Sequence, residues 1–484
     1  MLFNSLQFAV FFPVVTLLYY VLPHRARAPL LLGASCLFYM AFIPKYILIL
    51  ALLILVDFSA GILIEDGPDQ RRKIFLILSL CANIGILGFF KYFNFFNDNL
   101  ATLAHSFGWN YSIESLRIIL PIGLSFHTFQ SMSYTIEVYR GKVPAERSPL
   151  YFALYVMFYP QLVAGPIERP QNLLHQFREH HSFNWTNFAQ GMRLMVSGLF
   201  KKIVIADRIA LVVNTVYAHP GKYSGGPLLV ATWLFAVQIY CDFAGYTEVA
   251  RGAARIMGFD LMVNFNRPYL ATSIVDFWRR WHISLSTWFR DYLYFPLGGN
   301  RGSRARTAVN LALVFLISGL WHGANWTFII WGALHALFVV VYVLTESPRT
   351  WLAAALPARS RGTLALLGWL LTFNLVTLAW IFFRAANTRD AMLVLRKVFT
   401  ELGGQGASNI HAGLDALQFG LALALIAGFA GLEIVSTRWP LWALIAERPR
   451  WQRWAAYYAF GFLFFLLLLM SPQEGPQPFV YFQF

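Results

Sequence analysis

Two histidines stand where an imidazole could take part in group transfer. His322 lies in GLWHGANW, between two apolar runs. An ionisable side chain at membrane depth is costly to bury, so His322 is a candidate functional residue; the alternative is a histidine hydrogen-bonded between helices. Its flanking Gly319 and Gly323 would let a backbone or a substrate approach closely. His282, in WRRWHISLS, is expected near the membrane interface. Imidazole exchanges protons near neutral pH, so both histidines are candidate acid–base groups.

The segment 264–306 has seven arginines interleaved with Trp and Tyr. One interpretation is an interfacial belt of snorkelling arginines and aromatic rings. The other is a cytoplasmic platform for an anionic donor, because guanidinium groups suit phosphates. Both can hold together, and we expect a donor-binding role for three of these arginines. They are Arg279, Arg280 and Arg290.

The chain ends in FVYFQF, a hexapeptide without charge, in which Tyr481 carries the only hydroxyl. Such a sequence is a poor water-exposed tail. We expect it to dock into an apolar groove, with the protein's own cavity as one candidate. The alternative from these residues alone is a simple interfacial anchor.

Other polar residues have weaker signals. Asp242 and Glu248, in YCDFAGYTEVARG, could orient other groups or pair with the arginines that follow, Arg251 and Arg255. His335 lies in an apolar run, where packing is the expected role. There is no GxSxG, P-loop or HExxH motif, and the three cysteines lack metal-ligand spacing, so no metal site is expected.

Composition identifies the kind of element that must position these side chains. Of 484 residues, 58% are hydrophobic and only 13% are charged, against about 25% charged in soluble domains. This excludes an ordinary soluble enzyme and a disordered chain, and it indicates an integral membrane protein. The 38 basic and 23 acidic residues give a net charge of +15. We attribute that excess to basic cytoplasmic loops beside anionic lipid rather than to nucleic-acid binding.

The apolar segments predict a polytopic all-α domain over 1–470, followed by a tail at 471–484. They lie near 6–22, 29–44, 46–64, 74–91, 118–138, 149–164, 191–206, 228–243, 308–320, 324–345, 362–383, 416–436 and 454–470. Several are shorter than the ~20 residues that span hydrocarbon, so we expect broken or re-entrant pieces around a cavity within 240–325. The polar connection 385–415 contains a helix-like stretch from Arg389 to Phe399.

Basic residues in short loops predict the orientation. Four loops are placed in the cytoplasm on this ground, and the N-terminus and the tail, which has no Lys or Arg, are placed outside. The loops contain His24 to Arg27, Arg71 to Lys73, Arg140 to Arg147, and Arg438 to Arg453.

Six motifs follow one another over roughly 121–336. In order they are PIGLSFHTFQSMSYTIEVYRG, FYPQLVAGPIERP, GLFKKIVIAD, YCDFAGYTEVARGAARIMGF, FWRRWHISLSTWFRDYLYFPLGGNR and GLWHGANWTFIIWGALHA. Together they resemble the membrane-bound O-acyltransferase family, in particular its bacterial alginate O-acetylation branch, and the flanking regions are also similar.

The resemblance implies a multi-helix fold with a funnel or tunnel and acyl transfer from a cytoplasmic thioester. His322 matches the family's invariant histidine, expected to be the general base. His282 matches its second polar site, expected to position the acyl carbonyl or assist proton transfer. The D-alanylation branch has an F-x-Y-x-x-F tail on a separate small protein, and Phe479, Tyr481 and Phe484 match that pattern. Tyr481 is therefore expected to be an acyl carrier.

We therefore expect an inner-membrane O-acetyltransferase subunit that uses acetyl-CoA and a periplasmic acetyltransferase partner to modify an exopolysaccharide such as alginate. Acetylated cellulose and peptidoglycan systems are alternatives with the same chemistry. Two readings from other classes remain. One is a proton-coupled transporter, which predicts inverted repeats that are not evident. The other is a non-catalytic export scaffold.

Overall fold

The chain forms helices and connecting loops in the part described by a computed structural model, residues 1–116, 120–163, 165–357, 360–403, 409–439, 441–471 and 479–480. The helices are α1 Leu6–Val21, α2 His24–Met40, α3 Ile47–Asp66, α4 Asp69–Leu87, α5 Phe93–Ser106, α6 Leu124–Tyr139, α7 Pro149–Met157, α8 Pro170–Leu173, α9 Trp185–Leu199, α10 Asp207–Ala218, α11 Gly225–Ile256, α12 Ile274–Arg280, α13 Ile283–Phe289, α14 Arg304–His322, α15 Trp326–Leu344, α16 Glu346–Ala355, α17 Arg361–Arg384, α18 Thr388–Thr400, α19 Ala416–Arg438, α20 Leu441–Ala446 and α21 Arg450–Leu469. The helix expected near 389–399 is confirmed as α18.

Eight helices in the described chain are long and apolar enough to cross a membrane. They are Pro44–Asp66, Asp69–Ser106, Gly225–Ile256, Arg304–His322, Trp326–Leu344, Arg361–Arg384, Ala416–Arg438 and Arg450–Leu469. The first apolar run forms α1, which at 16 residues is shorter than a full span. The expectation of an all-α, multi-pass membrane protein is confirmed.

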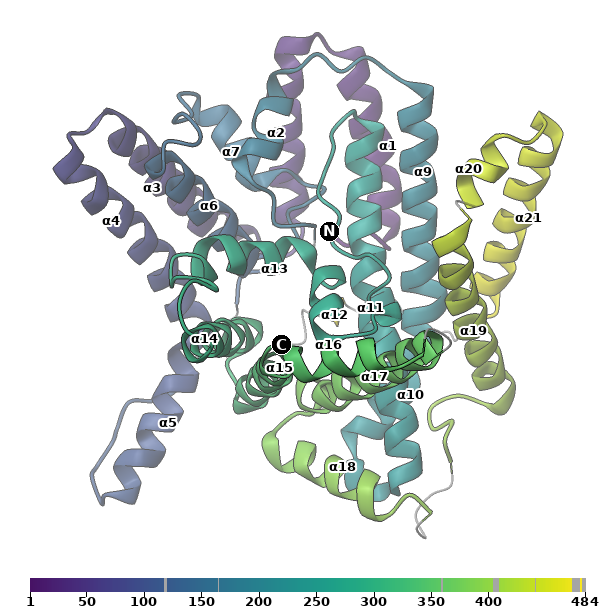
Figure 1. The fold of residues 1–484 in the computed structure, drawn as a ribbon. Coiled ribbons are helices and arrows are strands. Elements are labelled where there is room, and N and C mark those ends of the chain that lie inside the picture. Colours follow the sequence, from purple (N-terminus) through teal and green to yellow (C-terminus); the bar gives the residue numbers. More distant parts are fainter. Residues whose placement is uncertain are drawn as a thin grey trace.

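Helix α11 is the central element, and α9 packs along it (Figure 1). Glycines allow this close approach: a Cβ at Gly245 would lie 2.6 Å from the carbonyl oxygen of Gly198, and one at Gly252 would lie 2.5 Å from that of Gly191. Small residues at helix crossings let backbones meet where lipid supplies no hydrophobic driving force. By contrast, α21 is almost entirely exposed on the periphery.

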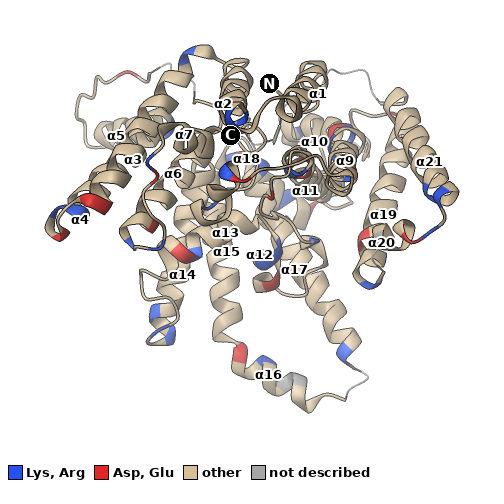
Figure 2. Cartoon of the chain, turned by 90° about the horizontal axis from the view of Figure 1, so that it is seen from above, with Lys and Arg blue, Asp and Glu red and all other residues tan. Residues whose placement is uncertain are grey.

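The basic loops gather on one side of the molecule. Figure 1 shows the α1–α2, α3–α4 and α6–α7 connections in the upper part of the view, with α20 at the upper right and with α5 and α18 at the bottom. In Figure 2, Lys and Arg mark the outer ends of α4, α14, α17 and α21. That these loops face the cytoplasm stays a prediction.

The arginine-rich segment is broken into short pieces, as expected. It contains α12, α13 and the π-helical segment Arg290–Tyr294. Between α12 and α13, His282 has a left-handed backbone with φ 43°. Such a conformation is strained for a residue with a side chain and is found at functional sites.

Candidate active site

A cavity of about 300 Å³ opens beside His322. Its walls come from α14, from the segment leading into α6, and from the C-terminal tail. The lining residues are Ile43, Lys91, Leu120, Pro121, Ile122, Gly123, Leu124, Ser125, Phe126, Val163, Trp321, His322 and Phe479. A cavity was expected within 240–325, and most of this one is instead lined by residues before 165, because distant helices meet here.

His322 is the last residue of α14 and is 6% exposed. The helix ends because Gly323 is extended, and α15 begins after Asn325, whose side chain caps the amide of Thr327 at 3.0 Å. The imidazole packs against the rings of Trp321 and Trp331, each with centroids 4.9 Å away. An imidazole at a helix break can reach a cavity without distorting either helix.

The glycines beside His322 serve helix packing. A Cβ at Gly319 would lie 2.4 Å from the carbonyl oxygen of Phe328, and one at Gly323 would lie 2.1 Å from the Phe328 ring. Of the two roles considered for these glycines, close approach of protein groups is therefore the one observed.

His282 is completely buried inside the protein, and its expected position near the membrane interface stays a prediction. It lies between the short helices α12 and α13, and its ring centroid is 4.7 Å from that of Phe243 and 6.3 Å from that of Trp321. Neither ring nitrogen has a hydrogen-bond partner among the described residues. A buried polar atom without a partner is costly, and a substrate or water could satisfy it.

Lys91 is a site residue that the sequence reasoning missed. It lies in the π-helical segment Gly88–Tyr92, a kind of distortion common at functional sites. Its ammonium donates to the carbonyl oxygens of Trp321 at 2.6 Å and His322 at 3.0 Å. In the described chain, no carboxylate is within ion-pair distance. A lysine inside the apolar run GILGFFKYFNFF was the available signal.

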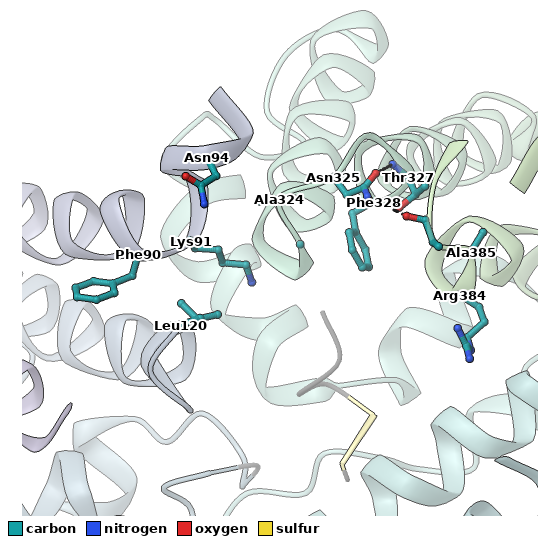
Figure 3. Close-up of a pocket in the computed structure, with 12 residues that line it drawn as sticks. Phe90, Lys91, Asn94, Leu120, Ala324, Asn325, Thr327, Phe328, Arg384 and Ala385 are labelled. Carbon is teal, nitrogen blue, oxygen red and sulfur yellow. Dashed lines mark hydrogen bonds between the residues drawn. The ribbon is translucent and has the colours of Figure 1, made fainter. Parts of the chain in front are cut away.

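Lys91 also lines a second, larger cavity of about 500 Å³. Figure 3 shows Lys91 and Arg384 on opposite sides of it, with Ala324 and Phe328 between them. Leu120 also belongs to both cavities, so the two adjoin. The larger one lies where α14 ends, α15 begins and α17 ends.

The tail enters the His322 cavity through Phe479. This residue is fully buried, and its ring lies 4.6 Å from that of Tyr246. Phe479 thus lies in the cavity and Val480 is buried beside it, and docking of the tail as a whole stays a prediction. Tyr481 and Phe484 lie outside the described residues.

A third cavity, of about 450 Å³, lies beside the α6–α7 connection. It is lined by Glu137, Lys142, Arg169, Gln171, Asn172, Met262, Asp291 and Tyr292. The Nη1 and Nη2 atoms of Arg169 have no hydrogen-bond partner among the described residues, although Asp291 lies 3.9 Å from Nη2. A guanidinium with unused donors can bind an anionic ligand.

The three arginines predicted to bind a donor line none of these cavities. Arg280 pairs with Asp276 at 2.9 Å, and Arg290 pairs with Asp291 at 2.8 Å. Arg279 belongs to the last turn of α12. Their donor-binding role stays a prediction.

A stack of aromatic rings separates the third cavity from the histidines. Tyr292 lies against Trp288 with ring centroids 5.1 Å apart. Trp288 stacks on Phe129 at 4.0 Å, and Phe129 stacks on Trp321 at 5.2 Å. Trp321 contacts both His282 and His322. The stack therefore leads from one side of the molecule to its buried centre.

The predictions for Asp242, Glu248 and His335 have different outcomes. Asp242 and Glu248 do not pair with Arg251 or Arg255; they pair with consecutive lysines, Lys202 and Lys201 respectively, that precede α10. The arginines were nearer in sequence, but the lysines face α11 across a helix crossing. His335 packs among aromatic rings, and its Nδ1 accepts a hydrogen bond from Trp278 at 3.3 Å.

Comparison with known proteins gives a consistent result. Residues 144–384 match the model described as MBOAT, membrane-bound O-acyltransferase family. A Pseudomonas aeruginosa protein named "Probable alginate O-acetylase AlgI" is 40% identical over 441 residues, covering 90% of this chain and 82% of the relative. A Helicobacter pylori peptidoglycan O-acetyltransferase is 36% identical, covering 87% and 83%. A Bacillus subtilis teichoic acid D-alanyltransferase is 31% identical over 47% of this chain and 60% of its own.

Proposed function

Since the chain belongs to the membrane-bound O-acyltransferase family and is an acyltransferase, we propose that it carries acetyl groups from acetyl-CoA across the bacterial inner membrane for O-acetylation of an exopolysaccharide such as alginate. A separate periplasmic acetyltransferase would complete the transfer to the polymer. The similarity to the alginate relative favours this polymer class. Peptidoglycan is the second candidate, because the Helicobacter pylori relative is almost as similar.

The donor would enter from the side that carries the basic loops, which would face the cytoplasm by the positive-inside rule. The cavity lined by Arg169 and Lys142 lies beside the α6–α7 connection, which contains one of the predicted cytoplasmic loops, Arg140 to Arg147. Their charges could hold the phosphates of CoA, and Arg279, Arg280 and Arg290 would add to the positive field. The acetyl thioester would then pass along the stack of rings towards His322. The N-terminus and the tail would be periplasmic.

In the first chemical step, the Tyr481 hydroxyl attacks the thioester carbonyl carbon. An O–C bond forms, the C–S bond breaks, and the products are acetyl-Tyr481 and CoA thiol. His322 accepts the phenolic proton and returns it to the departing sulfur. A phenol, with an unperturbed pKa near 10, needs such a base at neutral pH. In the second step an acceptor hydroxyl of the partner or polymer takes the acetyl group, and Tyr481 regains its proton.

Two further side chains would stabilise this reaction. The unused ring nitrogens of His282 could bind the acyl carbonyl. The Lys91 ammonium, already fixed by two carbonyl oxygens, has a third N–H and an unbalanced positive charge with which to stabilise the oxyanion. Both residues lie next to Trp321 and His322.

The observation that carries the proposal is that His322, Lys91 and the tail residue Phe479 line one cavity. The test uses full-length protein in detergent with acetyl-CoA, measuring released CoA and the mass of the C-terminal peptide. Wild type should gain one acetyl group on Tyr481. His322→Ala should slow transfer by about 10²–10⁴-fold while the protein remains folded, and Tyr481→Phe should abolish acetylation of the peptide.

Other outcomes would select a different function. A folded His322→Ala variant with wild-type turnover would exclude the general-base role. Normal polymer acetylation with Tyr481→Phe would exclude the carrier step. A protein that releases no CoA from acetyl-CoA, alone or with its partner, would favour the transporter or scaffold readings.

A further inference from the structure

The tail is held by its backbone as well as by its rings. The amide of Val480 donates a hydrogen bond to Oδ2 of Asp242 at 2.6 Å, and both residues are buried. On the preceding residue, the Phe479 ring packs between Phe243 and Tyr246, with centroids 5.5 Å and 4.6 Å away. Asp242, Phe243 and Tyr246 belong to α11, so the central helix of the fold supplies these three contacts.

Asp242 is itself part of a buried charge cluster with an excess of negative charge. The Lys202 ammonium lies 2.7 Å from Oδ1 of Asp242 and 2.8 Å from Oδ1 of Asp207. One cation therefore faces two carboxylates, and the side chains of Lys202 and Asp242 are each 3% exposed. A buried carboxylate needs donors at both oxygens. The Lys202 ammonium forms an ion pair with Oδ1, and the tail amide donates a hydrogen bond to Oδ2.

The π-helical segment Phe200–Ala206 explains why Lys202 reaches this place. The same segment presents Lys201 to Glu248, which also accepts from the hydroxyl of Ser197 at 2.9 Å. Helix α11 thus carries two acid–lysine pairs six residues apart. Among the described contacts, the Asp242–Lys202 pair touches the tail and the Glu248–Lys201 pair does not. A substitution at Glu248 is therefore the matched control for one at Asp242.

We propose that Asp242 is a positioning residue that clamps the tail at Val480 and thereby fixes the register of the tail for the acyl transfer proposed at Tyr481. The proposal rests on the proposed function for the identity of the transferred group. A hydrogen bond to a buried carboxylate is about twice as strong as a neutral one, and it recognises the backbone, so it sets the register of the tail. Because Tyr481 is covalently the next residue, holding the amide of Val480 limits the positions that the phenol can take.

The first test removes the donor and leaves the charge cluster intact. Val480→Pro has no amide hydrogen, whereas Val480→Ala keeps it. Both variants replace the same side chain, and only proline removes the amide hydrogen; it also fixes its own φ and restricts Phe479, so the exchange experiment below is the second, independent measurement. We expect Val480→Pro to form acetyl-Tyr481 at least about 10-fold more slowly than Val480→Ala, with CoA release by hydrolysis within about 2-fold of each other. Equal rates of acetyl-Tyr481 formation would overturn the proposal.

The second test measures docking without chemistry. Asp242→Ala and Glu248→Ala each remove one carboxylate from a lysine of the same segment, and amide hydrogen exchange of the C-terminal peptide is followed by mass spectrometry without acetyl-CoA. Asp242→Ala should speed exchange of that peptide by about 10-fold or more, and Glu248→Ala should leave it close to wild type. Equal exchange in the two variants would overturn the clamp.

These readouts separate the clamp from the carrier step. If wild type forms no acetyl-Tyr481 but exchange differs as expected, the carrier step fails and the clamp stands. If acetyl-Tyr481 forms but exchange is the same in both variants, the clamp fails and the proposed function stands. If Asp242→Ala does not fold, the comparison of Val480→Pro with Val480→Ala still tests the clamp.

Discussion

At the residue scale, the candidate site combines a histidine proposed as the base with a lysine that has no carboxylate at ion-pair distance among the described residues. His322 lies at the end of α14, and the Lys91 ammonium donates to the carbonyl oxygens of Trp321 and His322. A lysine in an apolar span without an acid beside it is costly. The cost is offset if negative charge develops beside it during the reaction, and acyl transfer develops that charge on the carbonyl oxygen.

Lys91→Met should separate this role from a structural one. Methionine has a similar length and no charge, so we expect the variant to fold with a thermal midpoint close to or above that of wild type. Acetyl-Tyr481 formation should fall about 10²–10³-fold, mainly in kcat. Wild-type kcat in the folded variant would contradict a role in oxyanion stabilisation.

The arginines differ in whether their guanidinium groups already have a partner or have donors left to bind an acyl donor. Charge-neutral substitutions at Arg279, Arg280 and Arg290 should raise the apparent KM for acetyl-CoA more than they lower turnover. Arg169→Gln should raise it further, because Arg169 lines a cavity and has unused donors, whereas Arg280 is already paired with Asp276. The effect should shrink as salt rises. An unchanged KM together with less protein in the membrane would make these arginines anchors.

At the scale of elements, two loops meet at one buried carboxylate. Glu168 accepts hydrogen bonds from the backbone of Met262 and the side chain of Asn172, each at 2.6 Å. Asn172 and Met262 also line the third cavity. Burial raises the pKa of Glu168 from 4.5 to about 7, against the opposing effect of these hydrogen bonds. The carboxyl group therefore binds a proton more tightly in the folded protein than in the unfolded chain.

The raised pKa of Glu168 makes the stability of the folded protein depend on pH. Between pH 4.5 and about 7 the folded state holds the Glu168 proton and the unfolded state does not, so stability should fall as pH rises through this window. An elevation of that size is worth roughly 3 kcal/mol at most. The thermal midpoint of Glu168→Gln, measured in detergent, should vary less over this window than that of wild type. Parallel curves for the two proteins would contradict the assignment.

At the scale of the whole molecule, the basic side and the tail side are connected through a packed centre. The rings of Tyr292, Trp288, Phe129 and Trp321 lie between the third cavity and the histidines, along the route proposed for the thioester. Stacked rings exclude water while giving an acyl chain an apolar surface. A membrane acyltransferase needs this combination, because water in the route would hydrolyse the thioester.

Phe129→Ala should open this route to water. Because the gap lies between the donor side and His322, we expect the ratio of acetyl-CoA hydrolysis to acetyl-Tyr481 formation to rise about 10-fold. Phe462→Ala, which removes an exposed ring on peripheral α21, is the matched control and should leave the ratio unchanged. An unchanged ratio in Phe129→Ala would mean that the stack does not exclude water.

The chain alone determined the membrane class and the family motifs, and it singled out His322 as a candidate base. These follow from composition, local charge and short-range order, which depend on neighbouring residues. The sequence also indicated that the tail docks, because FVYFQF has no charge to favour water.

Only the tertiary structure decided which distant residues meet. Lys91 reaches His322 across 231 positions, and Asp242 reaches Val480 across 238. Asp242 and Glu248 form ion pairs with Lys202 and Lys201, although Arg251 and Arg255 are nearer in sequence. His282 is buried because it lies between the short helices α12 and α13, which pack in the interior. Hydrogen bonds and ion pairs in a low-dielectric interior select partners by distance and direction in space, and helix crossings set those quantities, which no local pattern in the sequence contains.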